Sequence, residues 1–341
     1  MEVDLYLPGR PGEKPCGGAV PGHVLPRLAG FDPSPLPAVA SPAAVLENAR
    51  GGRIALDLQG IRIFRRRDLD GALAEAAVAA GAVRRSAKAE RLDEVRITAG
   101  GETRSYDWIV GADGARGLSR RSLGIPSRGD SVGLGGSLSG IEPSRLVLAF
   151  PGLGDSYAWI FPRPGGASVG IAYTPGKLAD EAARAVLDAF LDRHLPADWR
   201  DLPGPRYRYP IPVFGPWTLE GVRRALERRV LLVGDAAALA DPLTREGIRY
   251  GMLSGLWAAG SLIEGRPETY ADRLESELGE EMGKARRARE AFFESPMGQW
   301  MVPVARFHPG IRRVLADLLA CRQTYTGLKR RLIGAAIGYS E

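Results

Sequence analysis

The sequence predicts a mixed α/β protein in which a β-sheet domain is inserted between α/β segments and is followed by a helical region. A short apolar run at 229–233 leads into an acidic turn and then a small-residue helix at 247–262, which is the strand, turn and helix succession of α/β folds. Residues 133–173 form short alternating runs separated by Gly and Pro, as the strands of an antiparallel sheet do. The basic segment 281–341 is predicted to be helical.

The length, composition and charge of the chain indicate a globular protein and do not favour a nucleic-acid-binding one. With 341 residues, 45% of them hydrophobic and 25% charged, the chain is long enough for two globular domains. Forty-six Lys and Arg against 40 Asp and Glu give a net charge of +6. This excess is small, and no nucleic-acid-binding motif accompanies the Arg-rich stretches. A nucleic-acid partner is therefore not expected.

The two cysteines, Cys16 and Cys321, lie far apart in the sequence. They predict neither a metal cluster nor a disulfide framework, so we expect no metal and a reducing, cytoplasmic setting. No run of about 18 uninterrupted apolar residues is present that could span a bilayer. The protein is expected to be soluble or peripheral at a membrane.

The remaining elements follow from periodicity and from the positions of Gly and Pro. The expected elements before the central sheet are a strand at 3–7, an irregular loop at 8–22, a hairpin around 51–63, a helix at 68–80 and strands at 95–98 and 104–110. After the sheet, an amphipathic helix is expected at 178–195, with an apolar face formed by Ala182, Val186, Ala189 and Phe190. Breaks in the C-terminal helices are expected at Pro296, Pro303 and Pro309.

Asp235 is a candidate ligand-binding side chain because it follows the apolar strand directly. Ligands of open α/β sheets bind at the carboxyl ends of the strands. An aspartate there can accept a hydrogen bond from a ligand hydroxyl, while Gly247 and Ile248 offer the N-terminus of a helix to an electron-rich ring. A lone Gly-Asp also fits an aspartate that caps a helix, but here the whole segment 230–254 agrees with a ligand site.

This segment resembles the second FAD fingerprint of the p-hydroxybenzoate hydroxylase-like flavoproteins and, within them, of the geranylgeranyl reductase family. The matching positions are Gly234, Asp235, Ala236, Ala237, Pro242, Leu243, Thr244, Glu246, Gly247 and Ile248. Ala238 and Arg245 replace residues that are usually glycine in the family. Arg245 would place a cation near the isoalloxazine edge, where it would either stabilise an anionic flavin N1 or block the site.

Two segments resemble further FAD motifs of the superfamily. Asp113 and Gly114 match an Asp-Gly motif whose aspartate serves FAD, although Gly-Ala-Asp-Gly also fits a simple turn. Gly117 stands where a Ser is usual, and Arg120 and Arg121 occupy the expected basic positions. Arg66, which precedes Leu69, Asp70 and Leu73, matches the arginine that approaches FAD in the family.

Two other segments resemble motifs of the geranylgeranyl reductases themselves. The loop 14–18 resembles their Lys-x-Cys-Gly-Gly loop, and their Tyr-x-Trp-x-Phe-Pro signature is matched by Tyr157, Trp159, Phe161 and Pro162. Alternation along a strand places the three aromatic rings on one face, where they form either a wall for a prenyl chain or ordinary core. Cys16 is either a catalytic residue that shapes or protonates the site, or a small buried thiol without a chemical role.

The resemblance implies a Rossmann-like FAD-binding domain, an inserted antiparallel-sheet substrate domain and a helical tail. The FAD-binding domain would comprise residues 1–32, 60–126 and 226–280, the substrate domain 33–59 and 127–225, and the tail 281–341. The implied activity is the FAD-dependent reduction of C=C bonds in a prenylated small molecule or lipid, with NAD(P)H or a reduced redox protein as electron donor and a peripheral membrane contact. The alternatives are a flavin monooxygenase of the same fold and an FAD-less remnant that acts as a binding protein.

One expected part of the FAD site is missing. A dinucleotide-binding domain begins with a strand, a Gly-x-Gly-x-x-Gly loop and a helix that receives the pyrophosphate, and no segment of this sequence supplies that unit. Strand 3–7 matches the second strand of the family, so the first strand and its helix would lie before Met1. Either the functional protein is longer or this is a naturally shortened relative. We expect the chain as written to bind FAD poorly.

Overall fold

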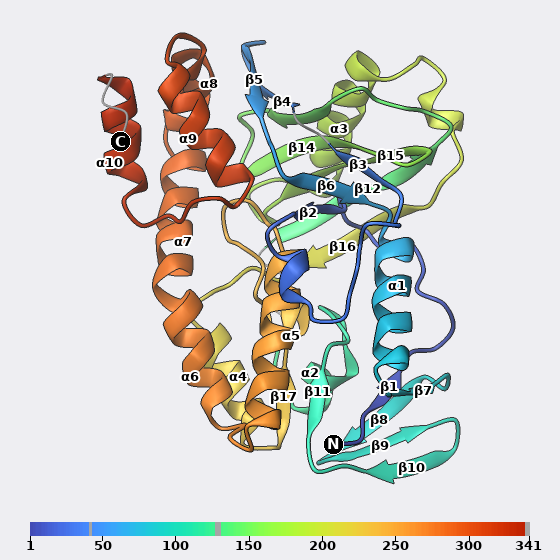
Figure 1. Cartoon of the computed structure of the whole chain (residues 1–341). Helices are drawn as coiled ribbons and strands as arrows, with labels where there is room; N and C mark the ends of the chain where they lie inside the picture. The colour runs from blue at the N-terminus through green and yellow to red at the C-terminus, as the bar shows by residue number, and fades with distance from the viewer. Residues whose placement is uncertain (41–42, 127–130, 338–341) are drawn as a thin grey trace.

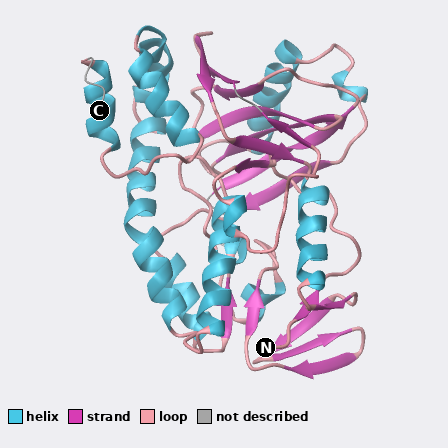
Figure 2. Ribbon diagram, viewed as in Figure 1, coloured by secondary structure: helices cyan, strands magenta, loops and turns pink. Residues whose placement is uncertain are grey.

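The computed structural model describes residues 1–40, 43–126 and 131–337. A large sheet lies at one end of the molecule and a smaller α/β region at the other, and long helices run along one side between them (Figures 1 and 2). Two predicted boundaries lie outside the described residues: the start of the second part of the substrate domain, at 127–130, and the end of the tail, at 338–341.

The large sheet has seven strands in the order β16-β12-β15-β14-β13-β4-β5. Its strands are β4 (Ala43–Asn48), β5 (Arg53–Asp57), β12 (Ser131–Ser139), β13 (Leu146–Phe150), β14 (Ser156–Arg163), β15 (Gly166–Tyr173) and β16 (Arg206–Ile211). All neighbours are antiparallel except β13 and β4. The predicted antiparallel sheet at 133–173 is therefore confirmed, and strands from the N-terminal part of the chain extend it.

Helix α3 (Asp180–His194) covers one face of this sheet. Its buried residues are Ala183, Leu187, Phe190 and Leu191, whereas the predicted face placed the exposed residues Ala182 and Ala189 inward. The helix is confirmed, and Phe190 and Val186 pack inward as predicted, but the predicted positions of Ala182 and Ala189 were wrong. Leucine buries far more apolar area than alanine, so the two leucines decide which side of the helix packs on the sheet.

The smaller region holds two separate pairs of parallel strands. Strand β1 (Asp4–Tyr6) pairs with β7 (Val83–Arg85), and β11 (Ile109–Gly111) pairs with β17 (Val230–Leu232). Within the described residues, no strand pairing joins one pair to the other. The other elements here are α1 (Arg66–Ala79), β8 (Ala89–Asp93), β9 (Arg96–Ala99), β10 (Glu102–Ser105), α2 (Leu118–Ser122), α4 (Thr218–Leu226), α5 (Ile248–Ile263) and α6 (Thr269–Leu274).

The predicted hairpin around 51–63 was wrong. Strand β5 pairs with β4, while β6 (Ile61–Phe64) belongs to a different sheet, between β2 (Ala19–Pro21) and β3 (Ala38–Ala40). Gly51 has φ +78°, a conformation that favours glycine, and it lies in the turn that closes β4 on β5. The true hairpin therefore lies one strand earlier than predicted.

The C-terminal region is helical as predicted, with α7 (Glu280–Phe293), α8 (Met297–Phe307), α9 (Pro309–Leu319) and α10 (Leu328–Ala336). Pro296 and Pro309 stand at helix starts, but Pro303 lies inside α8 and does not break it, contrary to the prediction. A proline removes the hydrogen bond to the carbonyl four residues earlier. Here the amide of Asn48 donates to that carbonyl, on Gln299, at 3.0 Å. None of the described helices is long and apolar enough to cross a bilayer.

Candidate functional site

A cavity of about 1210 Å³ lies between the large sheet, the N-terminal loop, α1, α5 and the C-terminal helices. This is larger than the roughly 300–1,000 Å³ typical of sites for one small ligand. Its walls fall into two parts: a polar part around Asp235, and an apolar part formed by the sheet and the C-terminal helices. The cavity therefore has room for more than one ligand group.

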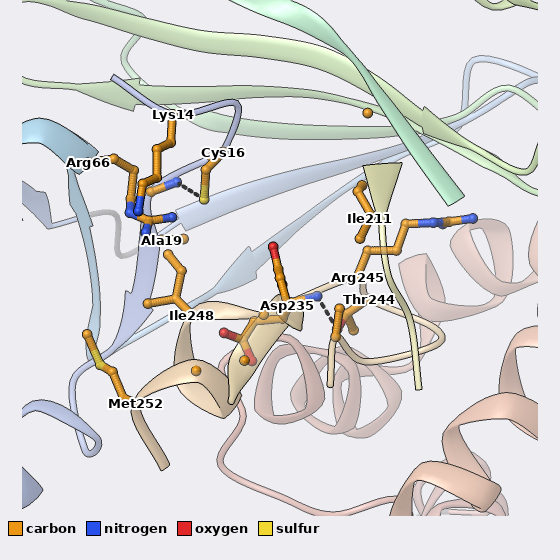
Figure 3. A pocket seen from close by; sticks show the side chains of 18 of the residues that line it. Lys14, Cys16, Ala19, Arg66, Ile211, Asp235, Thr244, Arg245, Ile248 and Met252 are labelled. Carbon is orange, nitrogen blue, oxygen red and sulfur yellow. Dashed lines mark hydrogen bonds between the residues drawn. The ribbon is translucent and has the colours of Figure 1, made fainter. Parts of the chain in front are cut away.

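Asp235 stands at the polar end of the cavity, in the 3-10 turn that follows β17. Its side chain points toward Lys14, Cys16 and Arg66 on the opposite wall (Figure 3). Within the described residues its carboxylate accepts no hydrogen bond. Burial raises the pKa of this carboxyl, and the charges of Arg66 and Lys14 only partly oppose that rise. A half-buried acceptor that lines a cavity and has no partner among the described residues is suited to a donor from a ligand.

The start of α5 is shaped around this carboxylate. A Cβ added to Gly247 would lie 3.2 Å from Asp235 Oδ1, so a side chain here would crowd the acid. Gly234 has φ +54°, and a Cβ on it would lie 3.2 Å from the Cα of Gly251. Glycine at these positions lets the turn and the helix approach one another and the cavity. Ile248 begins α5 and lines the cavity beside them.

The turn 241–247, which includes Pro242, is fixed from several sides. The buried carboxylate of Asp241 accepts the backbone N–H groups of Leu243 and Thr244, both at 2.8 Å, and the hydroxyl of Tyr325 at 2.9 and 3.0 Å. The hydroxyl of Tyr157 donates to the carbonyl of Thr244 at 2.7 Å. The sequence did not predict that Asp241 and Tyr325 belong to the site. An aspartate that bonds the backbone two residues later is a known turn signal, and it stood in the sequence as Asp241-Pro242.

Arg245 lines the cavity, but its guanidinium bonds partners on and beside the large sheet. It points away from Asp235 (Figure 3) and bonds Asp155 at 2.6 Å and Ser131 at 2.9 Å. The side chain is fully buried, and Asp155 also pairs with Arg289. Arg245 thereby ties the turn to the large sheet and to α7, and its position near the isoalloxazine edge stays a prediction.

On the opposite wall, a small charged cluster faces Asp235. Arg66 Nε lies 3.0 Å from Asp70 Oδ1, and Lys14 Nζ lies 2.6 Å from Asp70 Oδ2. Cys16 Sγ accepts the backbone N–H of Gly18 at 3.4 Å and also lines the cavity. The structure thus brings together the predicted Cys16, Arg66 and Asp235, which lie far apart in the sequence.

Asp113 and Gly114 line the cavity near its polar end. The carboxylate of Asp113 accepts the backbone N–H of Ser119 at 2.8 Å and its hydroxyl at 2.5 Å, so it also caps the short helix α2. A Cβ on Gly117 would lie 2.0 Å from Asp113 Oδ1. This contact explains why a serine does not fit at that position here. Behind the turn, buried Arg120 donates to the carbonyl of Ala236 at 3.1 Å.

The aromatic residues of β14 form part of the apolar wall. Tyr157, Trp159 and Phe161 all line the cavity, as expected from alternation along a strand. Pro162 follows Phe161, so it faces the other side of the sheet and is not part of the wall. The indole of Trp159 lies over Gly170, where a Cβ would come within 2.3 Å of it. The small residue on β15 makes room for the ring.

Most of the residues that form the apolar wall of the cavity were not predicted from the sequence. The large sheet contributes Leu46, Leu146, Leu148 and Phe150, and the C-terminal helices contribute Phe292, Phe293, Met297, Met301, Val302, Leu315, Leu318, Leu319, Leu328 and Leu332. The helices were expected from the sequence, but amphipathic periodicity does not tell whether an apolar face meets core or a cavity.

The chain is similar to several known proteins and solved structures. No protein-family model matches the chain. It is 33% identical over 47% of its length to a ubiquinone hydroxylase of Rhodospirillum rubrum, and 27% identical over 72% to digeranylgeranylglycerophospholipid reductase 1 of Methanopyrus kandleri. It is 27% identical over 74% to the chloroplastic geranylgeranyl diphosphate reductase of Nicotiana tabacum. These matches span 38%, 72% and 59% of the three relatives, so the chain covers less than two thirds of two of them.

Among solved structures, a geranylgeranyl bacteriochlorophyll reductase-like protein of Thermoplasma acidophilum superposes with a TM-score of 0.71 at 19% identity, covering 98% of this chain and 93% of that one. At this identity the likeness shows the fold alone. The chain thus shares its fold with this reductase-like structure. The curated proteins to which it is similar in sequence include a digeranylgeranylglycerophospholipid reductase and a geranylgeranyl diphosphate reductase.

Proposed function

We propose that the protein is an FAD-dependent oxidoreductase that reduces C=C bonds in the isoprenoid chain of a lipid or prenylated small molecule. The observation that carries the proposal is the shape of the cavity. One chamber joins the polar site at Asp235 and Arg66 to a long apolar wall on the large sheet and the C-terminal helices. A prenyl chain, which has no polar groups to satisfy, fits such a wall.

The polar site fits one half of FAD. Asp235 is a half-buried acceptor without a partner among the described residues, and glycine at positions 234 and 247 leaves room beside it. We propose that Asp235, the turn at Pro242 and the start of α5 hold the ribityl and isoalloxazine groups, with Arg66, Asp113 and Gly114 nearby. For the pyrophosphate, no described segment between β1 and β11 supplies a Gly-x-Gly-x-x-Gly loop at a helix start.

The chain's own residues then have separable tasks. Bound flavin supplies the hydride, which NAD(P)H or a reduced redox protein must replenish. Trp159 and Phe161 hold the prenyl chain along β14, and the apolar helices exclude water from the reacting carbons. Cys16 lines the same chamber, and we propose its thiol as the group that holds the proton for the second carbon. A peripheral membrane contact would give the protein access to lipid substrates.

The mass of the reaction product tests this proposal. The protein is incubated anaerobically with FAD, dithionite and geranylgeraniol, and the products are analysed by mass spectrometry. The expected product is heavier than the substrate by two hydrogens for each bond reduced. Flavin binding without reduction, together with an oxygenated product in air with NADPH, would assign the monooxygenase class instead. Failure to bind FAD at any concentration would contradict both.

Trp159→Ala should lower the affinity for long prenyl substrates by about ten- to a hundredfold, because the loss of a buried aromatic ring removes roughly 1.5–3 kcal/mol of apolar burial. Flavin binding should change little, since among the described residues the indole N–H of Trp159 donates to Ser168, at 3.2 Å, and makes no hydrogen bond to the turn. KM and FAD affinity are measured on the same preparation. Tyr157→Ala serves as the contrasting variant, because its hydroxyl holds Thr244 and its loss should weaken both. Equal losses in the two variants would show that Trp159 is ordinary core.

A further inference from the structure

The outer face of α8 exposes large apolar side chains to solvent. Met297 is 39% exposed, Trp300 53%, Val304 41% and Phe307 77%. Their spacing of three, four and three residues places them along one side of the helix. The opposite side is buried through Gly298, Val302 and Ala305. We call the four exposed residues the α8 face.

Positive charge surrounds the α8 face. From residue 295 to 316 the chain contains no Asp or Glu and three arginines, at 306, 312 and 313. The guanidinium carbon of Arg50, in the turn between β4 and β5, lies 5.2 Å from the ring centre of Trp300, and that of Arg306 lies 6.0 Å from the ring centre of Phe307. Apolar side chains with arginines beside them are the pattern of helices that lie in the interface of an anionic membrane.

The same helix forms part of the cavity wall. Met301 and Val302 line the cavity from α8, together with Leu315 and Leu318 from α9 and Leu332 from α10. Helix α8 packs against the edge of the large sheet at β4 and β5, beside C-terminal helices α9 and α10 (Figure 1). Met297, at the start of α8, belongs both to the α8 face and to the cavity lining. The face and the apolar chamber therefore meet at Met297, and one layer of helix separates them elsewhere.

We propose that the α8 face docks on the surface of an anionic phospholipid bilayer, and that the lipid substrate passes beside α8 into the cavity. The aromatic and aliphatic side chains would enter the acyl boundary, while Arg50 and Arg306 meet the head-groups. A second copy of the chain is a poorer occupant, because a two-fold interface would bring the arginines of both copies together. The docking proposal depends only on the exposed residues of the α8 face and the arginines beside them. The proposed path of the substrate rests on the proposed function.

Vesicle binding tests the docking. The full chain is sedimented with vesicles of phosphatidylcholine alone and of equimolar phosphatidylcholine and phosphatidylglycerol. We expect binding to the anionic vesicles that weakens with salt. The double variant Trp300→Ser/Phe307→Ser should bind at least about tenfold more weakly, because two aromatic side chains no longer enter the bilayer. Ile263→Ser, a matched control, removes an equally exposed side chain from the end of α5 (73% exposed) and should bind as the parent does.

Absence of parent binding to anionic vesicles would overturn the docking, and so would equal binding by the double variant in a folded state confirmed by its melting temperature. A parent that sediments as a dimer, with a monomeric double variant, would assign the face to a second copy and would also overturn it. Because vesicle binding needs neither flavin nor reduction, its failure is distinct from failure of the proposed function. If the docking and the proposed function both hold, the double variant should reduce a prenyl alcohol normally when it is dispersed in detergent and poorly when it is embedded in vesicles.

Discussion

Asp235→Asn should yield a more stable protein that has lost most of its affinity for FAD. The side chain is half-buried in the cavity wall, accepts no hydrogen bond from the described residues, and has its pKa raised by burial. Because a raised pKa in the folded state disfavours folding at pH 7, the uncharged amide should make the protein more stable there. A charge-assisted hydrogen bond to the cofactor is worth roughly 1.5–3 kcal/mol, so FAD affinity should fall about ten- to a hundredfold.

The pH dependence of this gain follows from the direction of the pKa shift. A carboxyl whose folded-state pKa lies above its unfolded value favours folding only when it is protonated, and that contribution disappears as the pH rises through the folded pKa. The stability difference between Asp235→Asn and the parent should therefore grow as the pH rises and level off above the folded pKa. It should shrink toward zero as the pH falls below the unfolded value of about 3.9. Melting temperatures across this range and a fluorescence titration with FAD measure both effects.

Asp113→Asn is the matched control for Asp235→Asn. Its carboxylate also lines the cavity but is already bonded to the backbone and hydroxyl of Ser119. This substitution should lower the melting temperature rather than raise it, because the two oxygens of Asp113 accept two hydrogen bonds from Ser119 and an asparagine has only one acceptor oxygen. An Asp235→Asn protein that is no more stable than the parent at pH 7 would mean that a partner satisfies this carboxylate.

Local sequence signals predicted the parts of the site that depend on backbone geometry. The strand before Gly234-Asp235 and the helix after Gly247 are where the sequence placed them. These features are local, because a turn that must bring a strand end to a helix start needs glycine at fixed positions. The alternation of Tyr157, Trp159 and Phe161 is local in the same sense, and the structure places all three in one wall.

The features that the sequence did not predict depend on distant partners. Tyr325 reaches Asp241 across 84 residues of sequence, and Arg245 reaches Asp155 across 90. Neither pairing leaves a pattern in one chain, because a charged residue in a loop is usually solvated. The family comparison suggested a role for Arg245 at the flavin edge. Its guanidinium turns to Asp155, in the loop before β14, and no local pattern reveals that partner.

Replacing Asp155 should destabilise the protein more than any other single change near the turn. Asp155 is the buried counter-ion of both Arg245 and Arg289, and their charges, against the effect of burial, lower its pKa. Asp155→Asn leaves two arginines without that counter-ion. The removal of one partner from a buried pair typically costs about 3–5 kcal/mol. Thermal unfolding at pH 7 should show this loss, while Glu294→Gln, which breaks an exposed pair with Lys177, should hardly change the melting temperature.

Variants of Arg245 separate the ion pair from the backbone conformation. Arg245 has φ +59°, which costs an ordinary residue roughly 1–2 kcal/mol but suits glycine. Arg245→Met loses the pair and keeps the strain, whereas Arg245→Gly loses the pair and relieves the strain, so the glycine variant should be the more stable of the two. Both should cost less than Asp155→Asn, because Asp155 retains Arg289. In the double variant Asp155→Asn/Arg245→Met the losses should be less than additive. Additive losses, or a methionine variant as stable as the glycine one, would show that the buried pair does not hold this turn.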